Sequence, residues 1–297
     1  IGKHEWAVTN RQPGLKGRVA LVTGGNSGPG LEVACGLATR GARLLLPVRR
    51  KANGEAALPA LQPRCPGAEV DLLTLDLSSL DSIAACAADV AARTRTLDFL
   101  VNNAGVMALA HRQETADGFE MQFGTNHLGH FALTTRLRPL LEAASGGGTV
   151  VTVASLAACK NTIQFDDLQS RHRYSPFGAY QQSKLANLLF ARELARRAGE
   201  NGWNIHSRAA HPGWSSTSII ANGPASSLPD AVGKAERVLG TAILRVMGQS
   251  AARGAEPLLY AALSPAARVG DYYGPPGAGE RRGPPDRQRP RRKHSHV

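Results

Sequence analysis

The sequence predicts an α/β fold with one doubly wound parallel sheet and helices on both faces. Short runs with strand character alternate with longer helical patterns along most of the 297 residues, which is typical of a parallel sheet covered on both sides. The first apolar run ends in a glycine-rich turn that leads into a helix. A composition of 42% hydrophobic and 20% charged residues suits a single large globular domain.

Each expected element follows from a local pattern. The expected strands are short runs rich in apolar residues, at 19–22, 42–48, 69–75, 97–102, 148–153 and 204–209. The expected helices follow longer apolar spacing, at 31–40, 78–95 and 176–198. Gly41 ends the first of these helices, because glycine readily takes the conformation in which helices stop.

The expected domain covers residues 1–279. Within it, residues 214–249 begin with Gly, Pro and Ser and continue with apolar helical spacing, so we expect a lid-like insertion there. Residues 280–297 carry seven Lys/Arg against two acids and supply +5 of the net charge of +12. Their Pro and Gly content predicts a mobile, solvated tail. The alternative is contact with nucleic acid or an acidic membrane, but the tail lacks aromatic residues for base stacking, so no nucleic-acid partner is expected.

The remaining composition favours a cytoplasmic protein without metal. No apolar stretch reaches the roughly 18 residues of a membrane span, and the polar amino end lacks a secretory pattern. The four cysteines and nine histidines are scattered, with no C-x-x-C pair. We therefore expect reduced thiols and no metal site.

The first functional signal is the turn T-G-G-N-S-G-P-G at residues 23–30. Its glycines let the backbone approach a pyrophosphate, and the following helix directs its first amides toward the negative charge. Such a turn can also be a plain strand-to-helix corner, but its position between the first strand and helix favours nucleotide binding. The expected contacts are Gly24, Asn26, Ser27, Gly28, Pro29 and Gly30.

The end of the second strand predicts which nucleotide binds. An acidic residue there would bind the ribose 2′-hydroxyl of NAD, whereas the sequence at 47–51 is P-V-R-R-K. A guanidinium such as that of Arg49 can bind a 2′-phosphate with two hydrogen bonds, so NADP(H) is the expected cofactor. The alternative is that Arg49 and Arg50 simply begin a solvated helix.

The second signal is the pair Tyr180 and Lys184. Four residues apart on a helix, the two side chains share one face, and the ammonium can lie near the phenol. A nearby cation favours phenolate and would let a tyrosine exchange protons near neutral pH. The alternative is a surface tyrosine packed beside a lysine stem.

Together these motifs resemble the short-chain dehydrogenases/reductases, from about residue 17 to 274. The matching pieces stand in that family's order, namely the turn at 23–30, Asp76-Leu77, the N-N-A-G stretch at 102–105, Asn126, Ser155, Tyr180 with Lys184, Pro212-Gly213, and Thr217. The stretches at 126–131, 165–168 and 179–187, and the long spacer between Ser155 and Tyr180, are similar to the retinol-dehydrogenase-like branch.

The resemblance implies a Rossmann-type fold and a set of catalytic residues. Tyr180 would exchange a proton with the substrate oxygen, and Ser155 would hold that oxygen. Lys184 would bind the nicotinamide ribose and favour tyrosinate, while Asn126 would hold a water that connects Lys184 to solvent.

The resemblance also implies further cofactor contacts. Asp76 and Leu77 would flank the adenine. Asn103, Ala104 and Gly105 would line the adenosine side, and Pro212, Gly213, Trp214 and Thr217 the nicotinamide amide. Two residues depart from the family pattern, Pro29 in the glycine-rich turn and Trp214 after Pro212-Gly213, and neither removes a catalytic group.

The expected function is NADP(H)-dependent hydride transfer between the nicotinamide and a carbonyl or alcohol substrate. A bulky apolar substrate would fit the apolar lid residues Ile219, Ile220, Val238, Leu239, Ile243, Leu244, Val246 and Met247, which could equally form the lid's own core. One alternative is a catalytically silent dinucleotide-binding regulatory protein on the same fold. Another is a sugar-nucleotide epimerase or dehydratase, for whose larger substrate domain the chain has little room. Assembly into a homo-oligomer stays open.

Overall fold

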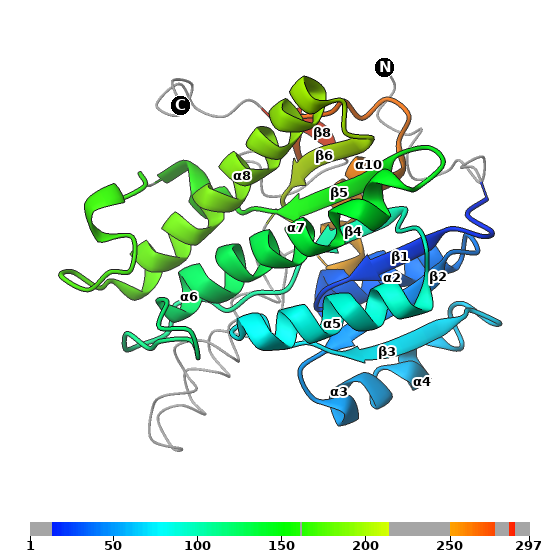
Figure 1. Cartoon of the computed structure of the whole chain (residues 1–297), viewed down its shortest axis with the longest axis horizontal. Helices are drawn as coiled ribbons and strands as arrows, with labels where there is room; N and C mark the ends of the chain where they lie inside the picture. The colour runs from blue at the N-terminus through cyan, green and yellow to red at the C-terminus, as the bar shows by residue number, and fades with distance from the viewer. Residues whose placement is uncertain (1–13, 161, 214–249, 277–284, 289–297) are drawn as a thin grey trace.

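The computed structural model describes residues 14–160, 162–213, 250–276 and 285–288. Its centre is a sheet of eight strands in the order β3-β2-β1-β4-β5-β6-β7-β8 (Figure 1). Strands β1 to β7 pair in parallel, and β8 pairs antiparallel with β7. Helices cover both faces, so the predicted doubly wound α/β fold is confirmed.

The strands lie close to their predicted positions. Their bounds are β1 Val19–Val22, β2 Arg43–Val48, β3 Val70–Thr74, β4 Phe99–Asn102, β5 Gly148–Val153, β6 Ile205–Ala210, β7 Tyr272–Gly274 and β8 Asp286–Gln288. The six predicted strands all form, with ends displaced by no more than about two residues, as is usual for element boundaries. The short strands β7 and β8 were not expected from the sequence.

The helices are connected by short loops. Their bounds are α2 Gly28–Ala38, α3 Lys51–Glu55, α4 Leu58–Leu61, α5 Leu80–Arg93, α6 Met121–Phe123, the π-helical turn η1 Gly124–Leu128, α7 Gly129–Glu142, the 3₁₀ turns η2 Leu156–Lys160 and η3 Phe165–Asp167, α8 Pro176–Asn201 and α10 Ala251–Leu263. Among the helices in the described ranges, none is both long and apolar enough to cross a bilayer.

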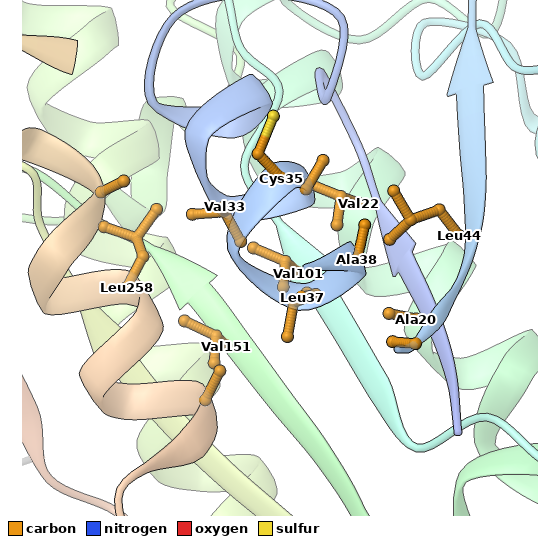
Figure 2. Packing of buried hydrophobic residues seen from close by; sticks show 14 of the residues in the cluster. Ala20, Val22, Val33, Cys35, Leu37, Ala38, Leu44, Val101, Val151 and Leu258 are labelled. Carbon is orange, nitrogen blue, oxygen red and sulfur yellow. The ribbon is translucent and has the colours of Figure 1, made fainter. Parts of the chain in front are cut away.

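Two hydrophobic clusters fill the two sides of the sheet. On one side, Val33 and Leu37 of α2 and Leu258 of α10 pack against strand residues such as Val101 and Val151 (Figure 2). On the other side, α5, α7 and α8 bury apolar side chains against the same strands. Burial on both faces holds the sheet rigidly. The carboxyl ends of its strands therefore form a stable surface that can position a site.

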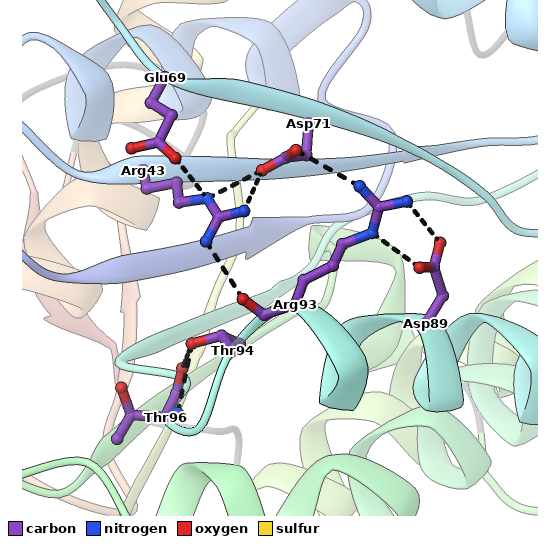
Figure 3. Close-up of polar contacts among 7 residues, drawn as sticks. All are labelled: Arg43, Glu69, Asp71, Asp89, Arg93, Thr94 and Thr96. Carbon is purple, nitrogen blue, oxygen red and sulfur yellow. Dashed lines mark hydrogen bonds and ion pairs between the residues drawn. The ribbon is translucent and has the colours of Figure 1, made fainter.

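An ion-pair network lies at the other end of the strands, where β2 begins and α5 ends. Arg43 at the start of β2 contacts Glu69 and Asp71 at 2.9 and 2.8 Å, and Arg93 at the end of α5 pairs with Asp89 at 2.7 Å (Figure 3). Arg43 also donates to the carbonyl of Arg93 at 3.3 Å. The network sets two guanidinium groups against three carboxylates, so it joins α5 to the sheet and leaves no free positive charge there for an anionic ligand.

The expected boundary at residue 279 differs from the structure. Strand β8 lies inside the tail 280–297, where Arg287 pairs with Asp271 at 2.7 Å and the main chain pairs with β7. Three polar residues of the tail therefore belong to the sheet, because an edge strand can form through main-chain bonds without an apolar pattern. The expected lid at 214–249, with Trp214 and Thr217, lies outside the described residues.

Candidate active site

The glycine-rich turn lies at the point where the strand order reverses. Strand β1 has β2 on one side and β4 on the other, and this switch point is where open α/β sheets bind ligands. Gly24 has a φ of +65°, which favours glycine. A side chain at Gly30 would collide with the Gly24 carbonyl and the Asn103 amide. The turn is thus a close-fitting backbone cradle of the kind that suits a pyrophosphate.

Thr23 and Asn103 tie this turn to the end of β4. The Thr23 hydroxyl accepts hydrogen bonds from the main-chain N–H groups of Asn103 and Ala104 at 2.9 and 3.0 Å. In return, the Asn103 amide donates to the Thr23 carbonyl at 2.8 Å. The predicted residues Asn103 and Ala104 therefore lie against the turn, with Gly105 next to them.

Helix α2 begins directly after the turn. Ser27 precedes the helix in an extended conformation and makes no side-chain cap bond, and Pro29 is buried in the first turn. Ser27 is exposed, and Gly28 and Asn26 are half-buried. Proline removes one amide from the first turn, so phosphate binding here would rely on the N–H groups around it.

Arg49 and Arg50 follow β2, beside the carboxyl end of β1. Both are exposed, and within the described part of the chain neither makes an ion pair, whereas the neighbouring Lys51 pairs with Glu55 at 3.7 Å. Exposed, unpaired guanidinium groups at this strand end suit a 2′-phosphate, because such a phosphate would meet no competing carboxylate.

Asp76 and Leu77 follow β3 as the sequence suggests. The Asp76 carboxylate accepts from the N–H and hydroxyl of Ser78 at 2.9 and 2.6 Å, so it organises its own loop. Leu77 is buried, and its carbonyl lies so close to Gly129 that a side chain there would clash. Helix α7 is thereby held against this loop.

Asn126 lies in the π-helical turn η1 and is fully buried. Its side-chain oxygen accepts from the Val106 N–H at 2.8 Å, and its amide donates to the Val106 carbonyl and the Ser183 hydroxyl at 2.9 and 3.0 Å. π-helical turns are frequent at functional sites. Because both amide hydrogens and the side-chain oxygen have partners within the protein, Asn126 fixes the loop beside Gly105 to helix α8.

Tyr180 and Ser155 meet at the carboxyl end of β5. Ser155 lies two residues beyond that strand, and Tyr180 is 7% exposed on α8. Burial raises the pKa of the Tyr180 phenol, and a hydrogen bond with the Ser155 side chain opposes this rise. A phenol with a raised pKa stays protonated at neutral pH, which is the form that can donate a proton.

Lys184 lies one helical turn beyond Tyr180. Its ammonium nitrogen is 5.9 Å from the centre of the Tyr180 ring and donates to the Val153 carbonyl at 3.0 Å. Lys184 is 2% exposed, and burial lowers the pKa of its ammonium to about 8. A buried cation beside the phenol is costly to fold, which is the pattern expected of a functional group.

Pro212 and Gly213 follow β6 at the same edge. The Gly213 N–H donates to Nδ1 of His211 at 3.1 Å, and Gly213 has a φ of +66°. The described chain stops at Gly213 and resumes at Ser250, so the expected contacts of Trp214 and Thr217 are not described.

The structure adds residues to which the sequence analysis gave no role. The Tyr272 hydroxyl donates to the Ser155 carbonyl at 3.3 Å, and the Val153 carbonyl receives both Lys184 and Asn187. A carbonyl carries no sequence signal. Tyr272 lies 117 positions from Ser155, so only the strand order could have indicated their contact.

The comparisons with known proteins show the family of this chain. A family model described as short chain dehydrogenase matches residues 18–226. Retinol dehydrogenase 12 of Homo sapiens is 45% identical over 199 residues, which are 67% of this chain and 62% of that protein. Polyprenol dehydrogenase of Mus musculus is 38% identical over 256 residues, which are 85% of this chain and 73% of that protein.

Solved structures give the same result for the fold. A crystal structure of a Mycobacterium Paratuberculosis protein is 36% identical with a TM-score of 0.73, covering 94% of this chain and 87% of that one. The Pseudomonas aeruginosa RhlG/NADP active-site complex is 25% identical with a TM-score of 0.64, covering 87% of this chain and 94% of that one. The chain therefore belongs to the short-chain dehydrogenase family, in its retinol-dehydrogenase-like branch.

Proposed function

We propose that the protein is an NADP(H)-dependent oxidoreductase that transfers a hydride between the nicotinamide and a carbonyl or alcohol substrate. The observation that carries this proposal is the meeting of Ser155, Tyr180 and Lys184 at the sheet edge that also holds the glycine-rich turn. A silent binding protein would gain nothing from a buried lysine held beside a tyrosine, because the buried charge lowers stability.

The residues have separate tasks in this proposal. The bound nicotinamide supplies or accepts the hydride. Tyr180 donates its phenolic proton to the carbonyl oxygen in reduction and removes a proton in oxidation. Ser155 holds the same oxygen. Its hydrogen bond to Tyr180 places the two hydroxyl groups next to each other, so both can reach one substrate oxygen. Lys184, protonated at neutral pH, places a positive charge beside the phenol and stabilises the phenolate left after proton donation.

Cofactor preference for NADP(H) rests on the end of β2. Arg49 and Arg50 are exposed there without an ion pair among the described residues, and no acid stands in the stretch 47–51. The RhlG structure is a complex with NADP, which supports the same preference. The roles of Asp76, Asn103 and Pro212 toward the cofactor, and of Asn126 toward a relay water, are parts of this proposal.

A bulky apolar substrate fits the surroundings of Tyr180. The Phe177 ring stacks on the Tyr180 ring with centres 6.1 Å apart and is 48% exposed. Phe165 is 72% exposed and follows Gln164, whose N–H donates to Gln182 on α8. Exposed aromatic rings beside a reacting group favour apolar ligands. The relatives named for retinol and polyprenol, both long apolar alcohols, support this substrate class.

A substrate panel tests the proposal. Purified protein is mixed with NADPH or NADH and a series of aldehydes and ketones of increasing apolar length, with NADPH absorbance as the readout, and the matching alcohols are run with NADP. We expect turnover with NADPH that rises with apolar length. Tight NADPH binding without turnover of any member would favour the silent binding protein instead. The cytoplasmic location and the homo-oligomer stay predictions.

A further inference from the structure

A buried histidine joins the glycine-rich turn to the π-helical turn. His130, the second residue of α7, is 1% exposed. Its Nδ1 lies 2.9 Å from the main-chain carbonyl of Asn126, and its Nε2 lies 2.9 Å from the Thr23 hydroxyl. One imidazole therefore bridges Thr23, which begins the pyrophosphate cradle, and Asn126, whose side-chain oxygen lies near Gly105 as the Lys184 ammonium does.

The partners of His130 determine where its proton lies. The Asn126 carbonyl can only accept, so Nδ1 must carry the hydrogen. The Thr23 oxygen already accepts two main-chain N–H groups and has no lone pair left for a third donor. Thr23 must therefore donate its own proton, and Nε2 at 2.9 Å is nearer than the Val101 carbonyl at 3.2 Å.

A neutral imidazole with its hydrogen on Nδ1 is the form that satisfies all these groups. A positively charged His130 would direct a second N–H at a hydroxyl that cannot accept it. Burial lowers the pKa of His130 to about 4, which agrees with a neutral ring at physiological pH.

The neighbouring His127 makes different contacts. It lies in the π-helical turn η1 with Asn126, bonds to the Asn187 side chain at 3.3 Å and contacts the Phe190 ring. It thus joins η1 to α8, and within the described part of the chain it makes no hydrogen bond to the glycine-rich turn. The two histidines offer a matched pair, one with a bond to the cofactor cradle and one without.

We propose that His130 is a positioning residue whose neutral imidazole holds Thr23 and the Asn126 carbonyl in one fixed arrangement. This inference rests on the proposed function, because only that function uses the glycine-rich turn, Asn126 and Lys184 in one reaction. Its two hydrogen bonds act on different steps. The bond to Thr23 holds the cradle for cofactor binding, and the bond to the Asn126 carbonyl holds the turn η1, whose Asn126 side chain lies near Gly105 as Lys184 does.

Two substitutions separate these two bonds. His130→Asn keeps a short donor for the Asn126 carbonyl and cannot reach Thr23, so we expect NADPH binding to weaken about tenfold while kcat falls less than about threefold. His130→Gln reaches Thr23 and loses the carbonyl, so we expect kcat to fall about tenfold with NADPH affinity within about threefold. Calorimetry measures the affinity, and thermal unfolding shows that each variant is folded.

His127→Asn is the control, and we expect its NADPH affinity to stay within about twofold of the wild type. Equal losses of NADPH affinity in His127→Asn and His130→Asn, each with a lower melting temperature, would show that His130 contributes only to packing. That result would overturn the proposal. So would identical kcat and affinity changes in the two His130 variants.

Imidazole ¹⁵N shifts of the wild-type protein test the arrangement without any substitution. We expect His130 to be protonated at Nδ1 and unprotonated at Nε2 from about pH 5 to 8, in the free protein. A ring protonated at Nε2 would contradict the inference. Failure of the wild type to bind NADPH would instead contradict the proposed function, and the ¹⁵N result would still decide the arrangement around His130.

Discussion

The catalytic corner and the end of β2 lie on the same sheet edge but are built in opposite ways. In the catalytic corner, Asn126, Lys184 and Tyr180 are 0%, 2% and 7% exposed, and their polar atoms have partners within the protein. At the end of β2, Arg49 and Arg50 are exposed and make no ion pair within the described ranges. The first region is held by hydrogen bonds within the fold, and the second is exposed to solvent.

Under the proposed function, this difference separates the groups that react from the groups that select the cofactor. Groups that react must be held within a few tenths of an ångström, so they are buried and hydrogen-bonded at a cost in stability. Groups that only recognise a phosphate can stay solvated, because a charged pair forms when the ligand arrives. Changes in the catalytic corner should therefore alter turnover and stability together, whereas changes at the end of β2 should alter cofactor affinity alone.

Tyr180→Phe should give the largest effect. The change removes one hydroxyl and leaves the ring to pack on Phe177, so turnover should fall by about 10²–10⁴-fold with little change in NADPH affinity. Steady-state kinetics and calorimetry measure the two quantities. Tyr174→Phe is the matched control, because the Tyr174 hydroxyl donates to the Leu109 carbonyl at 2.6 Å and lies outside the catalytic corner. A similar loss of turnover in both variants would show a general effect of tyrosine removal.

Lys184→Met should lower activity and raise stability. Burial lowers the pKa of this ammonium to about 8, which corresponds to a folding cost on the order of 3 kcal/mol. Met fills a similar volume without a charge, and Asn187 still donates to the Val153 carbonyl. We expect a higher melting temperature, a fall in turnover of about 10²-fold and weaker NADPH binding. A lower melting temperature would mean that Lys184 contributes to the fold as well.

Acid should destabilise the protein through its buried histidines. Burial lowers the pKa of His130 to about 4 and that of His211 to about 3, whereas an unfolded histidine titrates near 6.5. Below pH 6.5 the unfolded chain binds more protons than the folded one, so the free energy of unfolding falls as pH falls toward 4. The slope should reach up to about 1.4 kcal/mol per pH unit for each imidazole.

Urea unfolding at a series of pH values measures this slope. The window from about pH 6.5 to 5 lies above the ordinary range of most carboxyl groups, so histidines dominate there. A free energy of unfolding that stays constant across this window would contradict burial of neutral imidazoles at the site.

Arg49→Ala should change only cofactor choice. We expect the wild type to bind NADPH at least about tenfold more tightly than NADH, equivalent to about 1.4 kcal/mol, and the variant to lose most of that preference. NADH affinity and melting temperature should be unchanged, because the side chain is exposed. Lys51→Ala, at a residue paired with Glu55, serves as the control with a smaller effect. If calorimetry gave the wild type equal affinities for NADPH and NADH, the assignment of NADP(H) as the cofactor would be wrong.

Shortening the chain to residue 279 should have the smallest effect. The shortened chain lacks β8 and the Arg287–Asp271 ion pair, so we expect a loss of about 1 kcal/mol and a few degrees in melting temperature. Turnover should be unchanged, since β6 and β7 separate β8 from β5, the strand that Ser155 follows. A chain ending at residue 288 is the control. If turnover fell in the chain ending at residue 279 but not in the chain ending at residue 288, β8 would contribute to the active site.

The sequence was sufficient for features that local patterns determine. Strand β1 is a continuous apolar run before glycines, and both its ends were predicted correctly. Tyr180 and Lys184 were placed on one helix face by their spacing alone, and the structure has both buried there. Such features depend only on residues within a few positions of one another.

Contacts between distant segments could not be predicted in this way. The bond between His130 and Thr23 joins residues 107 positions apart and depends on the order of β1 and β4. In the sequence, His130 stands out only as part of the family-like stretch 126–131. Strand β8 consists of Asp, Arg and Gln, so it pairs through main-chain hydrogen bonds. No pattern of side chains in the sequence could have predicted these bonds.

Transfer of deuterium tests the central claim most directly. NADPH carrying deuterium at the transferable position is incubated with the wild-type protein and an apolar aldehyde from the substrate panel, and the alcohol product is analysed by mass spectrometry and NMR. We expect one deuterium on the carbinol carbon, with product formation reduced by about 10²–10⁴-fold in Tyr180→Phe. An alcohol product without deuterium, or one formed at the wild-type rate by Tyr180→Phe, would contradict the account.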